Sequence, residues 1–304
     1  MAGEAEDENA RGARRLLVIH NPTAGRRAAQ KLARWRAALA ALGAKVTLVE
    51  TEGPLHAITL ARGADATRFD AVAVAGGDGT INEAVNGLVG SSLPLTLLPL
   101  GTANVLANEL GLPRDLDALA HIAAFAPSRP VLPAELVSAE HPEPWRFLLM
   151  AGVGFDAEVV AHLDLTLKRR IGKGAYALGS LAQLARPARR FDAVLDGAAA
   201  RCASLVVARA HFYGGRFVLA PEARLDRDCL HAVVFPGASH GAALRYLAAV
   251  VLGRLPRQRD VTVSEAAEVE LRGPIGAPVQ VDGDIRAHLP ARIRLADRAL
   301  AIIA

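Results

Sequence analysis

Residues 71–83 read AVAVAGGDGTINE, in which a short apolar run passes through three glycines into a polar stretch. The apolar run Ala71–Ala75 is typical of a buried strand, and the residues that follow the glycines, 81–88, are typical of a helix. Glycine lets backbone N–H groups approach a ligand closely, and the amino end of a helix favours negative charge. The stretch therefore predicts a polyphosphate-binding loop, for which a turn without a ligand is the plain alternative. The five residues of this loop are Gly76, Gly77, Asp78, Gly79 and Thr80.

Strands and helices alternate on both sides of this loop. The predicted strands are 16–19, 45–49, 71–75 and 95–98, and the predicted helices are 26–42, 55–63, 81–88 and 102–110. Such alternation favours βαβ units and a mostly parallel sheet, whose ligands bind at the carboxyl ends of the strands. The sequence predicts a doubly wound α/β domain over residues 14–130, preceded by an acidic, disordered leader at residues 1–13.

Two further loops follow strands of the predicted sheet. NPTAG at 21–25 closes the first strand, and PLGTAN at 99–104 follows the strand at 95–98. Each of them is an ordinary turn when it is taken alone. Because parallel strands end at the same edge of a sheet, we expect the three loops to converge on one ligand.

The pattern changes near Pro127–Pro133, after which short β-like runs recur between turn residues. The runs are 134–138, 147–150, 193–195, 204–208, 232–235, 261–263, 269–271 and 279–281. Two helical stretches interrupt them, at about 160–186 and 239–253. The pattern predicts a β-rich, sandwich-like domain over residues 131–291, and the final segment 292–304 could return to the first domain.

Composition and charge narrow the function classes only slightly. The 304 residues are 52% hydrophobic and 22% charged, as in globular proteins, and the net charge is +4. Four acids and no base occupy the first ten residues, so the remainder carries +8. A basic chain could favour binding to nucleic acid, phosphates or an anionic membrane. However, arginine outnumbers lysine 31 to 4, which is typical of a composition bias of the genome. The net charge by itself therefore does not distinguish among these partners.

The two cysteines, Cys202 and Cys229, show no CxxC or metal-like spacing, which favours a reduced, cytoplasmic chain. The nine histidines form no HExxH or clustered metal pattern. The apolar run Leu247–Leu252 is far shorter than the roughly 20 residues that cross a bilayer. Any membrane contact is therefore expected to be peripheral.

Residues 163–190 mix basic and apolar side chains in a way that could bind an anionic bilayer. An amphipathic helix that covers the β-rich domain explains the pattern equally well. The basic residues are Lys168, Arg169, Arg170, Lys173, Arg186, Arg189 and Arg190.

The ordered set of motifs resembles the diacylglycerol kinase catalytic family, which includes bacterial lipid kinases, sphingosine kinases and ceramide kinases. The set is NPTAG, Thr51-Glu52, GGDGT and PLGTAN, followed by GVGFDA at 152–157, KRRIG at 168–172 and VDGD at 281–284. The resemblance covers about residues 15–304. GGDGT also occurs in NAD kinases and phosphofructokinases, but the full order is much more specific.

The resemblance implies an ATP- and Mg²⁺-dependent lipid kinase whose active site lies in the cleft between the two domains. Asp284 lies where the family carries the acid that deprotonates the lipid hydroxyl, and Asp282 is its neighbouring acid. Asp78 is expected near the catalytic Mg²⁺ or the reacting hydroxyl, and Asn104 is expected to contact the lipid. Asp156 could orient the lipid head group, and a role in a turn or as a helix cap explains it equally well. The residues that match the family's nucleotide contacts are Asn21, Thr51, Gly76, Gly77, Asp78, Gly79, Thr80 and Thr102.

Two departures from the family pattern bear on the substrate and on a structural metal. Asn104 is followed by Val105 where many bacterial diacylglycerol kinases carry an acid, as is also the case in sphingosine kinases. Arg227 replaces the second aspartate of an element that helps hold a structural Mg²⁺, although Asp226 or Asp228 could partly substitute for it.

We therefore expect transfer of phosphate from ATP to a lipid hydroxyl, of diacylglycerol or of a sphingoid or ceramide-type lipid, by an enzyme that visits an anionic membrane and binds no nucleic acid. A soluble small-molecule kinase of the NAD kinase type and a catalytically silent lipid-binding protein are the alternatives. The exact lipid, the nucleotide preference and the oligomeric state, including a homodimer, stay open.

Overall fold

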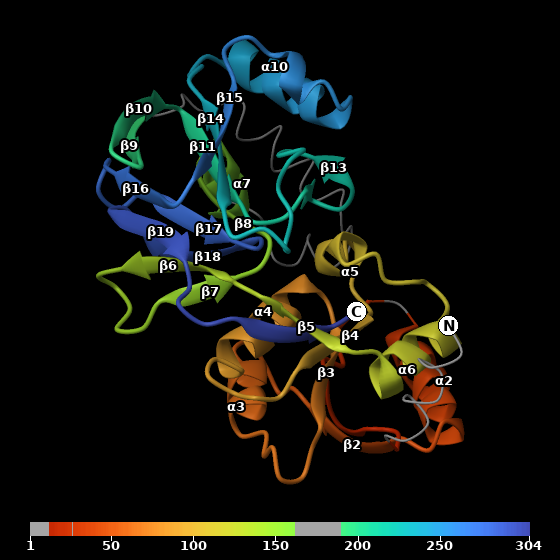
Figure 1. Ribbon diagram of the computed structural model, residues 1–304. Helices are drawn as coiled ribbons and strands as arrows, with labels where there is room; N and C mark the ends of the chain where they lie inside the picture. Colours follow the sequence, from red (N-terminus) through yellow and green to blue (C-terminus); the bar gives the residue numbers. More distant parts are fainter. Residues whose placement is uncertain (1–11, 26, 162–189) are drawn as a thin grey trace. The chain divides into compact units, whose positions relative to one another are not determined.

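The computed structural model describes residues 12–304 apart from residue 26 and residues 162–189 (Figure 1). Three predicted segments lie wholly or almost wholly outside the described residues. They are the leader at 1–13, the helix at 160–186 and the basic residues Lys168–Arg189. The chain divides into two compact units, one of residues 1–131 with 298–304 and the other of residues 132–297. They are called unit 1 and unit 2 below.

Unit 1 is built on a six-stranded sheet with the order β2-β1-β3-β4-β20-β5, in which only β5 runs antiparallel to its neighbour. The strands are β1 (Arg15–His20), β2 (Lys45–Glu50), β3 (Ala71–Gly76), β4 (Leu95–Pro99), β5 (Ser128–Val131) and β20 (Leu300–Ile303). The helices are α2 (Ala28–Ala41), α3 (His56–Arg62), α4 (Asp78–Gly87), α5 (Val105–Glu109) and α6 (Leu116–Phe125).

Helices cover both faces of this sheet, with α2 and α6 on one face and α3 and α4 on the other (Figure 1). On the first face Trp35 and Leu39 of α2 are fully buried with Leu16 and Val18 of β1. The central strands β1, β3 and β4 alternate their side chains between the two faces and are buried on both, which explains their largely apolar sequences. The predicted α/β amino-terminal domain is confirmed.

Unit 2 contains two six-stranded antiparallel sheets, in the orders β10-β9-β16-β19-β6-β7 and β15-β14-β11-β8-β17-β18. Buried side chains of both sheets, such as Phe147, Val153, Leu205 and Ile293, form one hydrophobic core, so the predicted β-sandwich is confirmed. The strands of the first sheet are β6 (Ala134–Ser138), β7 (Trp145–Phe147), β9 (Phe191–Leu195), β10 (Ala198–Cys202), β16 (Glu268–Arg272) and β19 (Ala291–Leu295). Those of the second are β8 (Met150–Gly154), β11 (Ser204–Ala208), β14 (Leu230–Phe235), β15 (Thr262–Ala266), β17 (Pro278–Val281) and β18 (Asp284–His288). The remaining elements are α7 (Phe155–Ala161), α10 (His240–Val251), a 3₁₀ turn (Leu255–Arg257) and the short strands β12 (Phe212–Tyr213) and β13 (Phe217–Val218).

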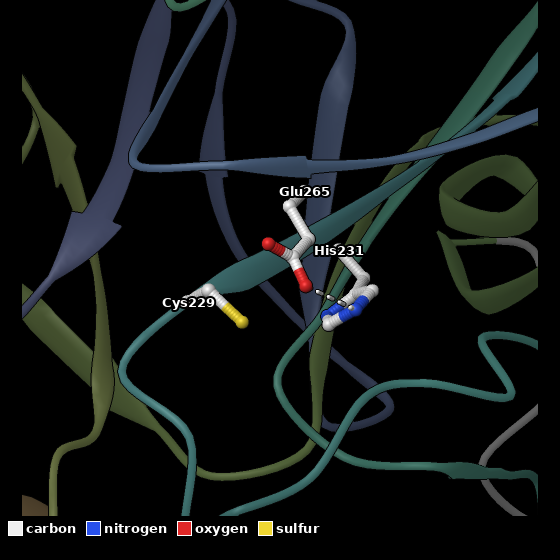
Figure 2. A group of neighbouring side chains, drawn as sticks. All are labelled: Cys229, His231 and Glu265. Atoms are coloured by element: carbon white, nitrogen blue, oxygen red, sulfur yellow. Dashed lines mark ion pairs between the residues drawn. The ribbon is translucent and has the colours of Figure 1, made fainter.

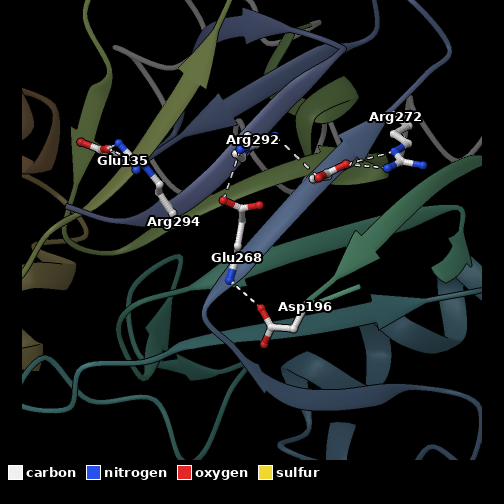
Figure 3. Close-up of polar contacts among 7 residues, drawn as sticks. Glu135, Asp196, Glu268, Arg272, Arg292 and Arg294 are labelled. Atoms are coloured by element: carbon white, nitrogen blue, oxygen red, sulfur yellow. Dashed lines mark hydrogen bonds and ion pairs between the residues drawn. The ribbon is translucent and has the colours of Figure 1, made fainter. Parts of the chain in front are cut away.

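Cross-strand ion pairs line one face of the first sheet (Figure 3). Glu135 of β6 faces Arg294 of β19, with 2.8 Å between their charged groups, and Arg292 lies 3.5 Å from Glu268 of β16. Asp196 accepts a hydrogen bond of 2.8 Å from the backbone N–H of Glu268. These opposite charges on facing strands help to fix the register of the sheet.

The structure differs from the predicted elements in several places, of which four bear on the site and the domain division. The run expected as one strand at 147–150 is split between β7 and β8, because the chain changes sheets there. Helix α4 begins at Asp78 rather than at residue 81, so the GGDGT loop enters its first turn. Helix α6 was not predicted. The chain returns to unit 1 only at Arg298, since β19 pairs with β16 and β6 inside unit 2. Within the described residues, no helix combines the length and the apolar character needed to cross a bilayer.

Candidate active site

Asn21 ties the NPTAG loop to the GGDGT loop. Its side-chain Nδ2 donates a hydrogen bond of 2.9 Å to Oγ1 of Thr80, and its backbone N–H donates one of 3.0 Å to the carbonyl of Ala75. Its Oδ1 accepts from both the N–H and the hydroxyl of Thr23. An asparagine at this position therefore fixes the shape of its own loop and its distance from α4.

The PLGTAN loop lies against the other two loops. The N–H of Leu100 donates a hydrogen bond of 2.9 Å to the carbonyl of Gly76. Gly25 approaches the same loop so closely that a Cβ there would lie 2.2 Å from the Leu100 carbonyl oxygen, and its φ of +71° also favours glycine. The three loops thus converge at the carboxyl ends of β1, β3 and β4, as the strand order predicts.

The GGDGT loop leads from β3 into the first turn of α4. Gly77 precedes the helix in an extended conformation (φ −99°, ψ −179°), and Asp78, Gly79 and Thr80 form the first turn. The backbone N–H groups of a first turn have no partner inside the helix and carry partial positive charge. The loop therefore has the chemistry that binds a phosphate group.

Asp78 faces α5. Its Oδ1 accepts a hydrogen bond of 3.1 Å from the N–H of Leu106, the second residue of that short helix. Burial raises the pKa of the Asp78 carboxyl, and hydrogen bonds from the backbone of Leu106, Val105 and Asn104 oppose this shift. Asp78 therefore has a structural role in addition to the expected one at a metal or the reacting hydroxyl, because its carboxylate caps α5.

The two other threonines of the expected nucleotide site differ in exposure. Thr51 follows β2, is buried, and donates its N–H to the carbonyl of His20 at 2.9 Å. Thr102 is exposed on the PLGTAN loop. Asn104 adopts a left-handed conformation (φ 47°), and its Nδ2 donates to the carbonyl of Gly101 at 2.9 Å, so the side chain shapes the loop.

Glu83 is a positioning residue that sequence reasoning missed. Its two carboxylate oxygens accept hydrogen bonds from the N–H groups of Leu55 (2.9 Å) and Ala57 (3.3 Å) at the start of α3. Because the negative charge complements the amino end of α3, Glu83 holds the loop after Thr51 against α4. An acid three residues after GGDGT is the sequence signal that could have indicated it.

In unit 2, the VDGD motif forms the turn between β17 and β18. Asp282 has a φ of 48°, its Oδ1 accepts from the N–H of Met150 at 2.9 Å, and its own N–H donates to the carbonyl of Met150 at 3.0 Å. Asp282 is therefore fastened to β8. The N–H of Gly283 donates to Oε1 of Gln280 at 2.9 Å, which fixes the other side of the turn.

Asp284 lies at the start of β18, two residues after Asp282. Its Oδ2 is 3.0 Å from the Nη2 of Arg286, and 41% of its side-chain surface is exposed. The guanidinium of Arg286 in turn lies 4.1 Å from the centre of the Trp145 ring. Asp284 thus combines accessibility with a cation that orients it.

Asp156 is buried beneath the VDGD turn rather than exposed for a lipid. The hydroxyl of Tyr213 donates to its Oδ1, and Nε2 of Gln280 donates to its Oδ2 at 2.6 Å. Burial raises the pKa of the Asp156 carboxyl, and the two donors oppose that shift. A Cβ on Gly152 would lie 2.0 Å from this carboxylate, which explains the first glycine of GVGFDA. Tyr213 and Gln280 lie far from Asp156 in sequence, so no motif indicated them.

Asp226 and Asp228 are exposed on a segment that a buried arginine holds. Arg209 donates to the carbonyls of Leu132, Arg224 and Leu225 at 2.6–2.9 Å. Burial lowers the pKa of Arg209, and the charges of Asp228 and Asp226 oppose this effect. The described contacts of Arg209 are with backbone carbonyls, so Asp226 and Asp228 as ligands of a structural Mg²⁺ stay a prediction.

Both halves of the chain match known family models. Residues 15–134 match the diacylglycerol kinase catalytic domain, and residues 150–304 match the YegS C-terminal NAD kinase beta sandwich-like domain. A diacylglycerol kinase of Mycobacterium tuberculosis is 31% identical in an alignment of 297 residues that covers 95% of this chain and 94% of that protein. The chain belongs to the diacylglycerol kinase catalytic family. It is a lipid kinase, as the motif order predicts.

Other relatives of this lipid kinase agree with that assignment. A protein of Chromohalobacter salexigens named "Probable lipid kinase YegS-like" is 30% identical over 257 residues, covering 81% of this chain and 80% of that protein. A crystal structure described as a diacylglycerol kinase of Bacillus anthracis superposes with a TM-score of 0.73 at 23% identity, over 96% of this chain and 98% of that one. At that identity the superposition shows the fold alone.

Proposed function

We propose that this lipid kinase transfers the γ-phosphate of ATP to the hydroxyl group of diacylglycerol or of a sphingoid or ceramide-type lipid. The observation that carries the proposal is the convergence of three loops at the amino end of α4. Asn21 and Thr80 are joined there by a hydrogen bond of 2.9 Å, and Leu100 and Gly76 by another.

On the nucleotide side, backbone N–H groups of Gly77–Thr80 bind the phosphates, aided by the partial charge of the α4 amino end. The hydroxyls of Thr51, Thr80 and Thr102 offer further hydrogen bonds. Mg²⁺, when bound with the nucleotide, neutralises charge on the phosphate oxygens, and Asp78 is the acid of this loop that could hold it. Asp78 also holds the PLGTAN loop in place through α5.

On the acceptor side, Asp284 takes the proton that the lipid hydroxyl loses while the hydroxyl oxygen attacks the γ-phosphorus. The bond from this phosphorus to the bridging oxygen breaks, and ADP leaves. The accessibility of its carboxylate and its pairing with Arg286 support this role. Asp282 is a less suitable base because Met150 engages both its side chain and its backbone. Asp156 supports Asp284 indirectly, since Gln280 connects it to the turn.

Membrane contact is proposed to be peripheral. Helix α10 exposes Leu244 and Val251, which lie on the same helical face, and Leu252 follows them. Arg254 and Arg257 are exposed directly beyond. Apolar side chains next to basic ones are suited to the surface of an anionic bilayer.

The experiment that tests the proposed function measures transfer from radiolabelled ATP to a panel of detergent-dispersed lipids, with NAD included. We expect labelled product with diacylglycerol, sphingosine or ceramide, formed about 10²–10⁴-fold more slowly when Asp284→Asn protein replaces the wild type. Labelled NAD would favour the small-molecule kinase instead. Lipid binding without any labelled product would favour the silent lipid-binding protein.

A further inference from the structure

Cys229, His231 and Glu265 lie together on one face of the β14–β15 pair (Figure 2). His231 is the second residue of β14, and Cys229 lies two residues before it, so the extended chain directs both side chains to the same side. Glu265 is the register partner of His231 on β15. The candidate ligand atoms Sγ, imidazole N and carboxylate O all lie within 4.8 Å of one another.

His231 is the unusual member of this cluster. Only 2% of its surface is exposed, and both ring nitrogens are buried without a hydrogen-bond partner among the residues that the structure describes. The nearest acid, Glu265, places Oε1 at 3.9 Å from Nε2, which is too far for a hydrogen bond. Buried polar atoms in native proteins are nearly always paired, so these nitrogens indicate a missing partner.

We propose that Cys229, His231 and Glu265 form a Zn²⁺ site. A thiolate, an imidazole and a carboxylate together suit this borderline-soft ion, whereas Mg²⁺ and Ca²⁺ require oxygen ligands. Three protein ligands leave the fourth tetrahedral position to water.

The geometry needs only a small adjustment to hold the ion. Zinc–ligand bonds of roughly 2.0–2.3 Å place tetrahedral ligand atoms about 3.3–3.8 Å apart. The side chains therefore have to approach by about 1 Å. Glu265, whose side chain is 59% exposed, and the half-buried Cys229 can rotate to do so. The β ladder holds the backbone of Glu265 and begins at Leu230, one residue after Cys229.

Arg227 is the competitor of the metal. Its Nη1 lies 3.5 Å from Oε1 of Glu265, and both side chains are mostly exposed. Exposed ion pairs of this kind are weak, so Zn²⁺ displaces the guanidinium from the carboxylate. Removal of the arginine should therefore strengthen metal binding.

The site is separate from the proposed chemistry of phosphate transfer. Strands β14 and β15 form one edge of their sheet, and the VDGD turn joins β17 and β18 at the other edge. A bound ion would fasten the segment before β14 to the edge strand β15. Neither the chain spacing of the cysteines nor that of the histidines predicts this site, because Glu265 comes from another strand.

The test uses untagged, reduced, metal-free full-length protein titrated with Co²⁺, followed by displacement with Zn²⁺. We expect one equivalent of Co²⁺ to produce a thiolate-to-metal charge-transfer band that Zn²⁺ abolishes. Cys229→Ser should remove the band and lower Zn²⁺ affinity by more than about 100-fold, beyond the effect usual for outer-shell residues. Cys202→Ala is the matched control, because this second cysteine is buried elsewhere and should leave the band intact.

Two surface variants keep the test independent of folding. Glu265→Gln should weaken Zn²⁺ binding at least about tenfold, as loss of a supporting ligand does, while the thiolate band persists. Arg227→Ala should tighten it. Absence of the band in wild-type protein, or equal Zn²⁺ affinity in wild type and Cys229→Ser, would overturn the proposal.

Discussion

The three aspartates of the GGDGT and VDGD motifs have different hydrogen-bond partners, and this difference distinguishes their roles. Asp282 is bonded to the backbone of Met150, Asp78 to that of Leu106, and Asp284 to the side chain of Arg286. The backbone partners tie Asp78 to α5 and Asp282 to β8, so each of these carboxylates also holds a loop in place. A side-chain partner on an accessible surface leaves the carboxylate able to meet a substrate.

Asp284→Asn is expected to lower kcat by about 10²–10⁴-fold with little change in ATP affinity, because a nearly isosteric amide cannot accept the hydroxyl proton. Single-turnover assays and nucleotide titrations measure the two effects. Asp282→Asn is the matched variant, and we expect a much smaller loss of rate from it. Retention of more than about a tenth of the wild-type rate by both variants would exclude a general base in this turn.

Asp78→Ala is expected to abolish turnover and also to lower the free energy of unfolding by about 1 kcal/mol, since α5 loses its capping carboxylate. Urea unfolding and lipid-dependent turnover measure these effects side by side. Asp117→Ala is the control, as this exposed acid lies in the first turn of another helix of unit 1, α6. Near-normal turnover of Asp78→Ala would remove Asp78 from the mechanism.

At the scale of elements, one chain of hydrogen bonds joins β12, α7 and the β17–β18 turn. It runs from Tyr213 through Asp156 and Gln280 to the N–H of Gly283. The buried carboxylate at its centre depends on its two donors, because an ion without partners in a core is costly. The position of the VDGD turn therefore depends on residues of three separate elements.

Gln280→Met should lower the free energy of unfolding by about 1–3 kcal/mol, because Asp156 and Gly283 each lose a buried partner while the side-chain volume is kept. Denaturant titration measures the loss, and Gln30→Met on the exposed side of α2 is the control. The same variant should reduce turnover by displacing Asp284. Unchanged stability would show that the hydrogen-bond chain contributes nothing to folding.

The buried Asp156 also predicts a pH dependence of stability. Its folded-state pKa is raised above the unfolded value by burial, so the folded state binds the proton more tightly. Stability is then highest below the unfolded pKa of about 4 and falls as pH rises through the folded pKa. The difference in unfolding free energy between wild type and Asp156→Asn should therefore shift in favour of the variant from pH 4 to pH 7. A pH-independent difference would contradict this account.

At the scale of the whole molecule, the chain passes from unit 1 to unit 2 after Val131 and returns at Arg298. The returning strand β20 lies between β4 and β5 and pairs with both. Unit 1 is therefore incomplete until the last residues have been added, although its other strands come from the first 131 residues.

Ile302→Ala should lower the free energy of unfolding by about 2–5 kcal/mol, the usual loss for a large aliphatic side chain in a core. Ile302 is fully buried in β20, whereas Ile275 is 88% exposed, so Ile275→Ala is the matched control. Thermal and urea unfolding of both variants measure the difference. Equal stability of the two variants would show that β20 is dispensable to the sheet.

The sequence alone determined the two kinds of fold and the positions of the three loops after β1, β3 and β4, because those signals are local. Alternating apolar runs and helical stretches predict the parallel sheet, and glycines after the strands predict where the chain turns. The family resemblance rests on the same short motifs. Glu83 and Asp156 lie inside or next to these motifs, but their partners are at other positions along the chain.

Only the tertiary structure decided what each polar residue contacts. Tyr213 and Gln280 are 57 and 124 residues away from Asp156, and Glu265 comes to His231 only through strand pairing. Hydrogen bonds and metal geometry act over a few ångströms, whereas sequence patterns report periodicity along a single segment. The roles of Asp78 as a cap and Asp156 as a buried anchor therefore follow from packing.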